Sequence, residues 1–357
     1  MSGESVGRAY VRVGESRPIP KTVDWDNAPS VFKLYRGGPK IPLDGQFPLG
    51  QKKLGQKKLG QFLRDVYGLT RQRWFAPSEV SRNGRRRDPA RVRPSASITS
   101  RPVPAGGARY PCELYLLAGS DQPVPPGVYH YDPAHHCLDV LRDGVPEAGL
   151  SLLISVAFWK NVFKYGEFSY RLHSLDAGVV LGQILAVAAR HALDPRVHFQ
   201  FSDAALDRLL GLDPAYESVY AVITLAPAST VDPAPIGMSE LIGQPVTSHP
   251  QSIGSYPLPA ELHQVAMHQG GGPWPKGERP SPVLADAPGS IGSVPLPAAS
   301  LDLLEGLDRR RSSKGHFRPG TVSRHQLSAL LSGSMRGYAS DLGDHESVIR
   351  HTMLCCA

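Results

Sequence analysis

The chain has 357 residues, of which 41% are hydrophobic, so it can bury the core of one large domain or two smaller ones and is not a wholly disordered protein. Lys and Arg outnumber Asp and Glu by 39 to 32. The resulting net charge of +7 suits an anionic cofactor, an acidic peptide or a nucleic acid, without choosing among them.

The cysteines and the apolar runs limit the class of protein further. The four cysteines have no metal-ligand spacing, so neither a zinc site nor a disulfide framework is expected. The N-terminus is polar, and the longest apolar run, residues 148–159, is only about twelve residues long and too short to cross a bilayer. We therefore predict a cytoplasmic protein that has no metal site and does not enter a membrane.

Much of the positive charge lies in an arginine-rich run at residues 82–93. Asn83-Gly84 and Pro89 interrupt this run, which has no apolar periodicity. Because no aromatic residues that could stack on bases alternate with the arginines, we interpret it as a solvated surface loop and not as a nucleic-acid site.

The N-terminal part of the chain mixes turn signals with short apolar clusters, and we expect residues 1–22 to be disordered. The pentamer Gln-Lys-Lys-Leu-Gly occurs twice in tandem at residues 51–60. Two copies are too few for a solenoid, so the repeat predicts a helical or loop spacer. Apolar residues at helical spacing from Phe62 to Tyr67 then predict a helix that ends at Gly68.

Residues 113–225 have the pattern of an α+β fold. Apolar runs predict strands, two of which form a hairpin around the turn 132–136. The segment 170–192 is apolar nearly all round and predicts a helix buried in the core. Asp203 is the predicted N-cap of a short helix between the last two strands. The predicted strands are residues 114–118, 128–131, 138–141, 152–158, 197–201 and 219–225.

After residue 226 the composition turns to Pro, Gly and Ser, which predicts a linker with one helix at 259–268. A basic cluster at 309–314 and an amphipathic stretch at 323–331 indicate a second ordered segment. The predicted division is a disordered N-terminus at 1–22, a lobe at 23–226, a linker at 227–300 and a partial second lobe at 301–357.

Four motifs stand in a definite order along the chain. The first is Trp25-Asp-Asn-Ala-Pro29, followed by Phe32-Lys-Leu-Tyr35. The second, Pro104-Ala-Gly-Gly-Ala-Arg-Tyr-Pro111, precedes the first strand of the α+β region. Its small residues let backbone N–H groups closely approach a flat ring and its polar edge. The third is Lys164-Tyr-Gly166 with Tyr170-Arg171, and the fourth is Arg310-Arg-Ser-Ser-Lys314 before Phe317.

Together these motifs resemble the SagB-type azoline dehydrogenases, a branch of the nitroreductase superfamily, in a double-lobed form with a truncated second lobe. The resemblance covers about residues 23–225 and a shorter part from Leu301. It implies an α+β, nitroreductase-like FMN-binding fold, in which helices flank a mixed sheet, a central helix is buried and a partial second lobe follows.

The resemblance also implies an FMN site. The family usually has Ser where this chain has Ala105, so one hydroxyl contact is missing. The guanidinium groups and the hydroxyl of the fourth motif suit the FMN phosphate. The alternative is that the motif is only the start of a basic helix and binds no phosphate. The implied ligands are Pro104, Ala105, Gly106, Gly107 and Arg171 in the first lobe and Arg310, Arg311, Ser312 and Lys314 in the second.

The third motif is the most specific and implies the chemistry. Azoline oxidation removes a proton from one ring carbon and a hydride from its neighbour, which FMN accepts at N5. Tyr165 would be the base, because the adjacent Lys164 cation favours the phenolate. The alternative is that Tyr165 is a packing aromatic and Lys164 a surface charge before a helix.

Nitroreductases bind each flavin between two lobes, and here the first lobe has the glycine loop while the second has the phosphate motif. Residues 301–357 leave no room for a second sheet and central helix. A homodimer, an intramolecular pseudo-dimer or a partner chain would therefore complete the site, or the protein is a decayed enzyme.

The leading hypothesis is an FMN-dependent dehydrogenase that oxidises thiazoline or oxazoline rings in ribosomal peptide natural products. It implies a peptide substrate and a cyclodehydratase partner. An NAD(P)H-dependent nitro or quinone reductase would share the flavin site without needing Lys164 and Tyr165. A non-catalytic scaffold or peptide-binding partner of a flavoenzyme is the third hypothesis, favoured by Ala105 and the short second lobe.

Overall fold

A computed structural model gives the fold of the predicted lobe and of parts of the C-terminal third. The described residues are 3–16, 20, 22–23, 28–43, 56–75, 96–120, 122–144, 149–226, 239–246, 256–268, 295–300, 303–312, 320–334 and 337–341. The arginine-rich run and Lys314 lie outside them. The helices are α1 (Gly3–Ser16), α2 (Gln56–Tyr67), α3 (Trp159–Tyr165), α4 (Ser169–Arg190), α5 (Asp203–Leu210), α6 (Leu258–Ala266), α7 (Leu303–Arg309) and α8 (Arg324–Ser334).

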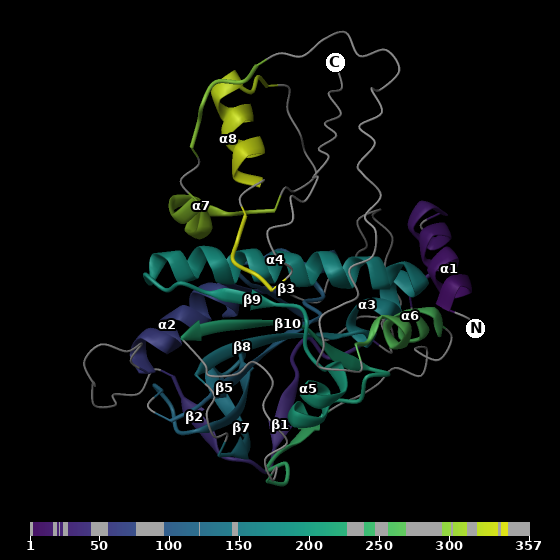
Figure 1. Cartoon of the computed structure of the whole chain (residues 1–357), viewed down its shortest axis with the longest axis vertical. Helices are drawn as coiled ribbons and strands as arrows, with labels where there is room; N and C mark the ends of the chain where they lie inside the picture. Colours follow the sequence, from purple (N-terminus) through teal and green to yellow (C-terminus); the bar gives the residue numbers. More distant parts are fainter. Residues whose placement is uncertain are drawn as a thin grey trace.

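A seven-stranded sheet forms the centre of the fold, in the spatial order β2-β7-β6-β5-β8-β10-β9 (Figure 1). Its strands are β2 (Lys40–Pro42), β5 (Cys112–Ala118), β6 (Gly127–Asp132), β7 (Cys137–Asp143), β8 (Leu150–Ala157), β9 (Arg196–His198) and β10 (Glu217–Ala226). Two further two-stranded sheets pair β1 (Leu34–Arg36) with β11 (Gln244–Val246) and β3 (Arg71–Phe75) with β4 (Ala96–Ser100). The predicted α+β class, the hairpin and the principal strands and helices are confirmed.

The pairing of the strands differs from the expected mixed sheet. Every ladder between the named strands is antiparallel. Among the described residues, parallel pairing is limited to the single bridge between Val197 and Ser340 at the edge. Part of the physical reason is that β5 and β6, and β6 and β7, are neighbours joined by short connections, which can link antiparallel strands but not parallel ones.

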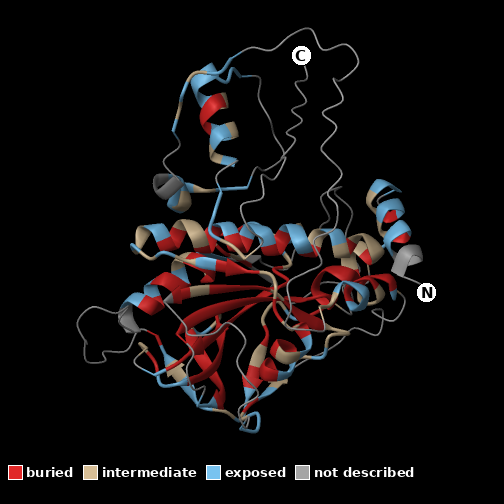
Figure 2. Ribbon diagram, in the orientation of Figure 1, coloured by how far each residue is buried: buried red, intermediate tan, exposed pale blue. Residues whose placement is uncertain are grey.

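Both faces of the sheet are buried, which explains the continuous apolar runs in its central strands (Figure 2). On β5, Leu114 and Leu116 belong to a larger core shared with α2 and α4. Tyr115 and Leu117 point to the other face and pack in a smaller core with α5. This division follows from the alternation of side chains along a strand.

Helix α4 crosses one face of the sheet, and its two sides differ. Val180, Ile184 and Val187 are buried in the larger core, whereas Leu175 and Val179 are 57% and 39% exposed. The prediction of a helix buried all round is therefore wrong for the outer side. An apolar residue pattern does not distinguish a covered face from an uncovered one, and this helix is apolar on both.

One helical stretch in the described part of the chain, Trp159–Arg190, is long and apolar enough to cross a membrane by length and composition alone. A core helix of a folded domain meets the same criteria. Since the inner side chains of α4 pack against the sheet, we interpret the stretch as a core element.

The N-terminal segment, expected to be disordered, contains helix α1. Ala9 and Val13 lie one turn apart on this helix and are buried against Leu258 and Leu262 of α6. The prediction fails because the apolar partner of this short amphipathic helix lies far along the chain, inside the segment interpreted as a linker.

The N-cap of α5 is one residue earlier than predicted. The side chain of Ser202 accepts a hydrogen bond from the backbone N–H of Ala205, whereas Asp203 is already helical. The carboxylate of Asp203 instead accepts a hydrogen bond from the backbone N–H of His268. Ser and Asp are equally good caps, so the sequence alone does not choose between adjacent ones.

The C-terminal part of the chain adds to the sheet at β9. The N–H of Val197 donates to the carbonyl of Ala339 at 2.9 Å, and the N–H of Asp341 donates back to the carbonyl of Val197 at 3.2 Å. The carboxylate of Asp341 accepts hydrogen bonds from the N–H groups of Phe199 and Gln200. Residues 337–341 therefore extend the sheet by a short parallel contact.

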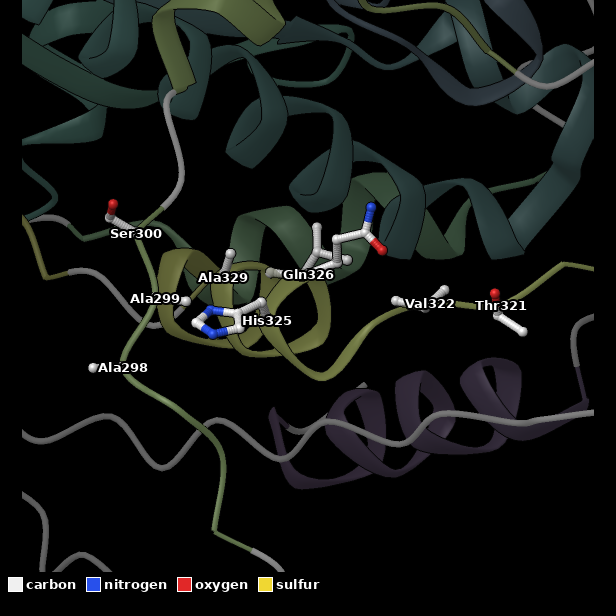
Figure 3. A pocket seen from close by; sticks show the side chains of 9 residues that line it. Ala298, Ala299, Ser300, Thr321, Val322, His325, Gln326 and Ala329 are labelled. Carbon is white, nitrogen blue, oxygen red and sulfur yellow. The ribbon is translucent and has the colours of Figure 1, made fainter.

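Helix α8 begins with a reciprocal cap, in which Ser323 and Gln326 each donate a backbone N–H to the other's side chain, at 2.9 and 3.1 Å. A shallow pocket lies between α8 and the segment 295–300, with His325 and Gln326 among its lining residues (Figure 3). It contains none of the site residues predicted from the sequence.

Candidate functional site

The glycine loop lies between β4 and β5 and is tied to two helices. The N–H of Gly106 donates to one carboxylate oxygen of Asp176 on α4 at 2.9 Å. The amide of Asn161 on α3 donates to the other oxygen at 3.0 Å. Burial raises the pKa of Asp176, while these two hydrogen bonds favour its charged form. Asp176 thus fixes the distance between the loop and both helices, and Ala105 packs against the core beside it.

The loop has an unusual backbone. Gly107, Ala108 and Tyr110 have φ values of 59°, 55° and 50°, in the left-handed region that residues other than glycine rarely adopt. Buried Lys160 holds the last of these turns, because its ammonium donates to the carbonyl of Tyr110 at 3.3 Å and to that of Val31 at 3.1 Å. Strained backbone of this kind is often found at binding sites.

The central observation is that the loop meets the Lys-Tyr pair. A Cβ added at Gly107 would overlap both the Nζ of Lys164 and the hydroxyl of Tyr165. The absence of a side chain at Gly107 therefore allows the two functional groups to reach the loop backbone. Two motifs more than fifty residues apart in the sequence, each predicted separately, form one site.

Lys164 and Tyr165 lie in the last turn of α3 and are both partly exposed. The Nζ of Lys164 is 5.2 Å from the centroid of the Tyr165 ring. Gly166 has a φ of 55° and ends the helix directly after the pair. Tyr165 is therefore not a fully buried packing aromatic, and its role as the base stays a prediction.

Arg109 adds a second cation to this site. Its guanidinium is 4.8 Å from the centroid of the Phe163 ring and donates to the carbonyl of Pro29 at 3.0 Å. Burial lowers the pKa of Arg109, and the nearby Tyr165 acts in the opposite direction. The sequence motif contains Arg109 without predicting a role for it, although its place inside the glycine loop was a usable signal.

A buried ion pair supports the site from the side of the sheet. Glu113 on β5 pairs with Lys160 and lies 3.3 Å from the imidazole of His130. Burial alone would raise the pKa of Glu113, but the positive charges of Lys160 and His130 hold it at about 2. Sequence reasoning missed this pair and Asp176, because single polar residues in apolar segments give no signal of their partners.

The phosphate motif reaches the start of the glycine loop. The guanidinium of Arg310 donates to the backbone carbonyls of Pro102 and Arg101, and to the hydroxyl of Ser312 at 3.3 Å. Arg311 is exposed and donates to the carbonyls of Asp308 and Arg310. The two motifs expected to share one flavin are therefore adjacent in this chain, although Lys314 lies outside the described residues.

Arg171 is placed differently from the other predicted ligands. It is exposed on α4, and a Cβ added at Gly14 of α1 would lie 3.4 Å from its Nη1. Within the described part of the chain, no hydrogen bond joins Arg171 to the glycine loop. Its position as an FMN ligand remains a prediction.

Several polar atoms around the loop have no hydrogen-bond partner among the described residues. All three guanidinium nitrogens of Arg101 are buried and unpaired, as are the Nε of Arg109 and the Oδ1 of Asn161. The Arg101 guanidinium is 4.1 Å from the centroid of the Tyr67 ring. Unpaired buried polar groups are costly, so the presence of several around the glycine loop indicates a place for a polar ligand.

Comparisons with known proteins identify two curated relatives over about a third of the chain. No protein-family model matches the chain. The trifolitoxin-processing protein TfxB of Rhizobium leguminosarum bv. trifolii is 29% identical over 143 residues, which are 34% of this chain and 38% of that protein. The microcin B17-processing protein McbC of Escherichia coli is 28% identical over 142 residues, 34% of this chain and 52% of that protein. The chain thus spans about half or less of these curated relatives.

Solved structures show the fold. The crystal structure of a nitroreductase candidate from Anabaena variabilis matches with a TM-score of 0.50 and 23% identity, over 64% of this chain and 47% of that one. A chain of the E. coli microcin synthetase McbBCD complex, solved with truncated pro-MccB17 bound, has a TM-score of 0.37 and 20% identity, over 52% of this chain and 70% of that one.

The fold is therefore of the nitroreductase type, a class of α+β fold that commonly binds flavin. Over the matched residues, the chain is a distant homologue of the McbC and TfxB processing proteins. The fold and the distant relation to McbC-like proteins predicted from the four motifs are confirmed.

Proposed function

We propose that this chain is an FMN-dependent dehydrogenase that oxidises thiazoline or oxazoline rings to azoles during the maturation of ribosomal peptide natural products. The observation that carries the proposal is the meeting of Gly107 with the functional groups of Lys164 and Tyr165. A nitroreductase-type flavin site needs a small-residue loop, whereas an azoline dehydrogenase also needs a base beside it.

The residues around the loop fit an FMN cofactor. The missing side chains at Gly106 and Gly107 bring the loop backbone close to Asn161, Lys164 and Tyr165. The Nε of Arg109, in the same loop, is buried and has no hydrogen-bond partner among the described residues. Arg310 and Ser312, next to the start of the loop, supply charged and hydroxyl donors suited to a phosphate. When bound, FMN supplies the acceptor for the substrate hydride.

The chain's own residues would then handle the proton. The Tyr165 phenolate would accept the proton from one ring carbon. The electron pair of that C–H bond would form the new double bond as the hydride leaves the neighbouring ring carbon. The Lys164 ammonium, 5.2 Å from the centroid of the Tyr165 ring, places a positive charge beside the proposed base. Asp176 ties the loop to α4 beside this pair.

The remaining parts of the proposal concern assembly. The outer side of α4 exposes Leu175 and Val179, one turn apart, next to Leu172, which borders Gly106. An exposed apolar strip that continues from the flavin loop suits pairing with a second copy of the lobe, so we propose a homodimer. We also propose a cytoplasmic location, a peptide substrate that contains azolines and a cyclodehydratase partner.

The test is the chemistry of the purified full chain. The flavin released by denaturation should be FMN, and an azoline-containing peptide should bleach its absorbance under anaerobic conditions, with the azole peptide detected as a mass loss of two hydrogens. Bleaching by NADH but never by the azoline peptide would identify a nitro or quinone reductase. A protein that binds no flavin, even with FMN added, would be a non-catalytic partner, in keeping with Ala105.

A further inference from the structure

Helices α1 and α6 form a small unit beside the end of α3 and the start of α4 (Figure 1). They pair through the buried side chains of Ala9, Val13, Leu258 and Leu262. The ring of Tyr10 on α1 lies edge-on to Tyr170 on α4, with centroids 6.0 Å apart. The unit comes from two segments that flank the predicted lobe in the sequence, so tertiary contacts hold it against the core.

This unit lies directly against the residue that follows the Lys-Tyr pair. A Cβ added at Gly166 would lie only 2.9 Å from Cε1 of Tyr256 and 3.4 Å from Cδ of Pro20. The missing side chain at Gly166 therefore allows the Tyr256 ring, two residues before α6, to pack on the backbone next to Tyr165. Tyr256 itself is only partly buried.

Helix α6 is anchored firmly enough to fix the position of Tyr256. The ring of His263 stacks on Tyr220 of β10, with centroids 5.7 Å apart and an angle of 5° between the planes. It also lies edge-on to Phe158 at 5.0 Å, and His263 is only 5% exposed. These ring contacts join α6 to the end of the sheet from which α3 begins.

We propose that the unit of α1 and α6 forms a wall on the substrate side of the Lys164–Tyr165 site, and that Tyr256 is a positioning residue whose ring contacts the five-membered heterocycle of the peptide. The inference rests on the proposed function. A base transfers a proton efficiently only when the reacting carbon is held within reach, and an aromatic ring offers a flat heterocycle a contact area without a hydrogen-bond requirement. The Tyr256 ring packs on Gly166, the residue after the proposed base Tyr165, and can therefore provide this contact.

The test compares variants of the full chain loaded with FMN. Tyr256→Ala should lower kcat/KM for an azoline peptide by about tenfold, the size expected for loss of an aromatic contact. Tyr256→Phe should retain most of it. Val265→Ala is the matched control, because Val265 is 54% exposed on the same helix.

A role in folding alone would shift the melting temperature and the FMN dissociation constant, so both are measured for every variant and should stay constant in Tyr256→Ala. An unchanged kcat/KM in Tyr256→Ala, a loss that Tyr256→Phe does not restore, or a parallel loss of flavin affinity overturns the inference alone. A wild-type protein that binds FMN but does not oxidise the peptide overturns the proposed function, and this inference with it.

Discussion

The backbone N–H of Gly106 and the carboxylate of Asp176 lie 2.9 Å apart and join the glycine loop to the central helix. Asp176→Ala should therefore loosen the loop and weaken FMN binding by roughly ten- to a hundredfold, the range expected when a charge-assisted hydrogen bond is lost. Flavin fluorescence titration measures this. Ser174→Ala, at an exposed position on the same helix, is the control. Equal affinity in Asp176→Ala and the control would show that the loop does not depend on Asp176.

Gly107→Ala tests the contact between the loop and the Lys-Tyr pair. The added Cβ overlaps Lys164 and Tyr165, and the φ of 59° costs an alanine about 1–2 kcal/mol. Flavin binding and azoline oxidation should both fall sharply, together with the free energy of unfolding. Gly178→Ala, where a Cβ meets no atom within 4 Å, should instead stabilise the helix by about 0.5–1 kcal/mol. Urea denaturation of both variants gives the sign of each change in the free energy of unfolding. A Gly107→Ala variant with the stability and flavin affinity of wild type would contradict the described site.

Substitution of the two arginines of the phosphate motif should have different effects on the binding of FMN and of riboflavin, which lacks the phosphate. Arg311 is exposed and has no contact with the loop, so Arg311→Ala should weaken FMN by roughly ten- to a hundredfold and leave riboflavin unaffected. Arg310 also holds the carbonyls of Arg101 and Pro102, so Arg310→Ala should weaken both flavins. Arg324→Ala, an exposed arginine on α8, is the control. If Arg311→Ala binds FMN like wild type, the cluster is only surface charge.

The fold could be predicted where the signal is local. The apolar runs along β5 to β8, the hairpin turn and the apolar spacing in α2 are properties of neighbouring residues, and those elements are confirmed. The helix α1 could not be predicted, because its stability depends on α6, which lies far away in the sequence. The exposed side of α4 was missed for a related reason, since composition describes what a face is made of and not what covers it.

The residues of the candidate site also fall into two groups, those with a local sequence signal and those without one. Gly106, Gly107, Lys164 and Tyr165 could be selected from short motifs, because the motif itself carries the chemistry. Asp176, Lys160 and Glu113 act through partners on other elements, and only the folded chain brings those partners within hydrogen-bond distance. These charged side chains support the loop from buried positions. For this reason they lie in segments whose other residues are apolar core residues.

The buried histidines predict an acid-sensitive anchor for α6. Burial lowers the pKa of His173 to about 3 and that of His263 to about 4, both below the usual 6.5. The unfolded chain therefore binds protons that the folded chain does not, so stability is full above about pH 6.5 and falls as the pH drops toward 4. For each histidine the loss between pH 7 and pH 5 is on the order of 2 kcal/mol.

His263→Phe keeps a ring in the aromatic cluster and removes the titrating group, so its stability should depend less on pH than that of wild type. Urea denaturation at pH 7 and pH 5 gives the two differences. Burial raises the pKa of Asp207 to about 7, which acts in the opposite direction but equally in both proteins. Identical pH dependence in the two proteins would show that His263 does not titrate as its surroundings indicate.

The last prediction concerns the proton transfer itself. Tyr165→Phe keeps the ring that lies beside the Lys164 ammonium and removes only the oxygen that meets the loop at Gly107. FMN binding should survive, whereas anaerobic bleaching by an azoline peptide should slow by about 10²–10⁴-fold, the usual contribution of a positioned base. Lys164→Ala should act in the same direction, because the phenolate loses its nearest cation. Lys58→Ala, at an exposed lysine on α2, is the control. Stopped-flow absorbance measures the rates, and bleaching that is indifferent to both substitutions would remove Tyr165 from the chemistry.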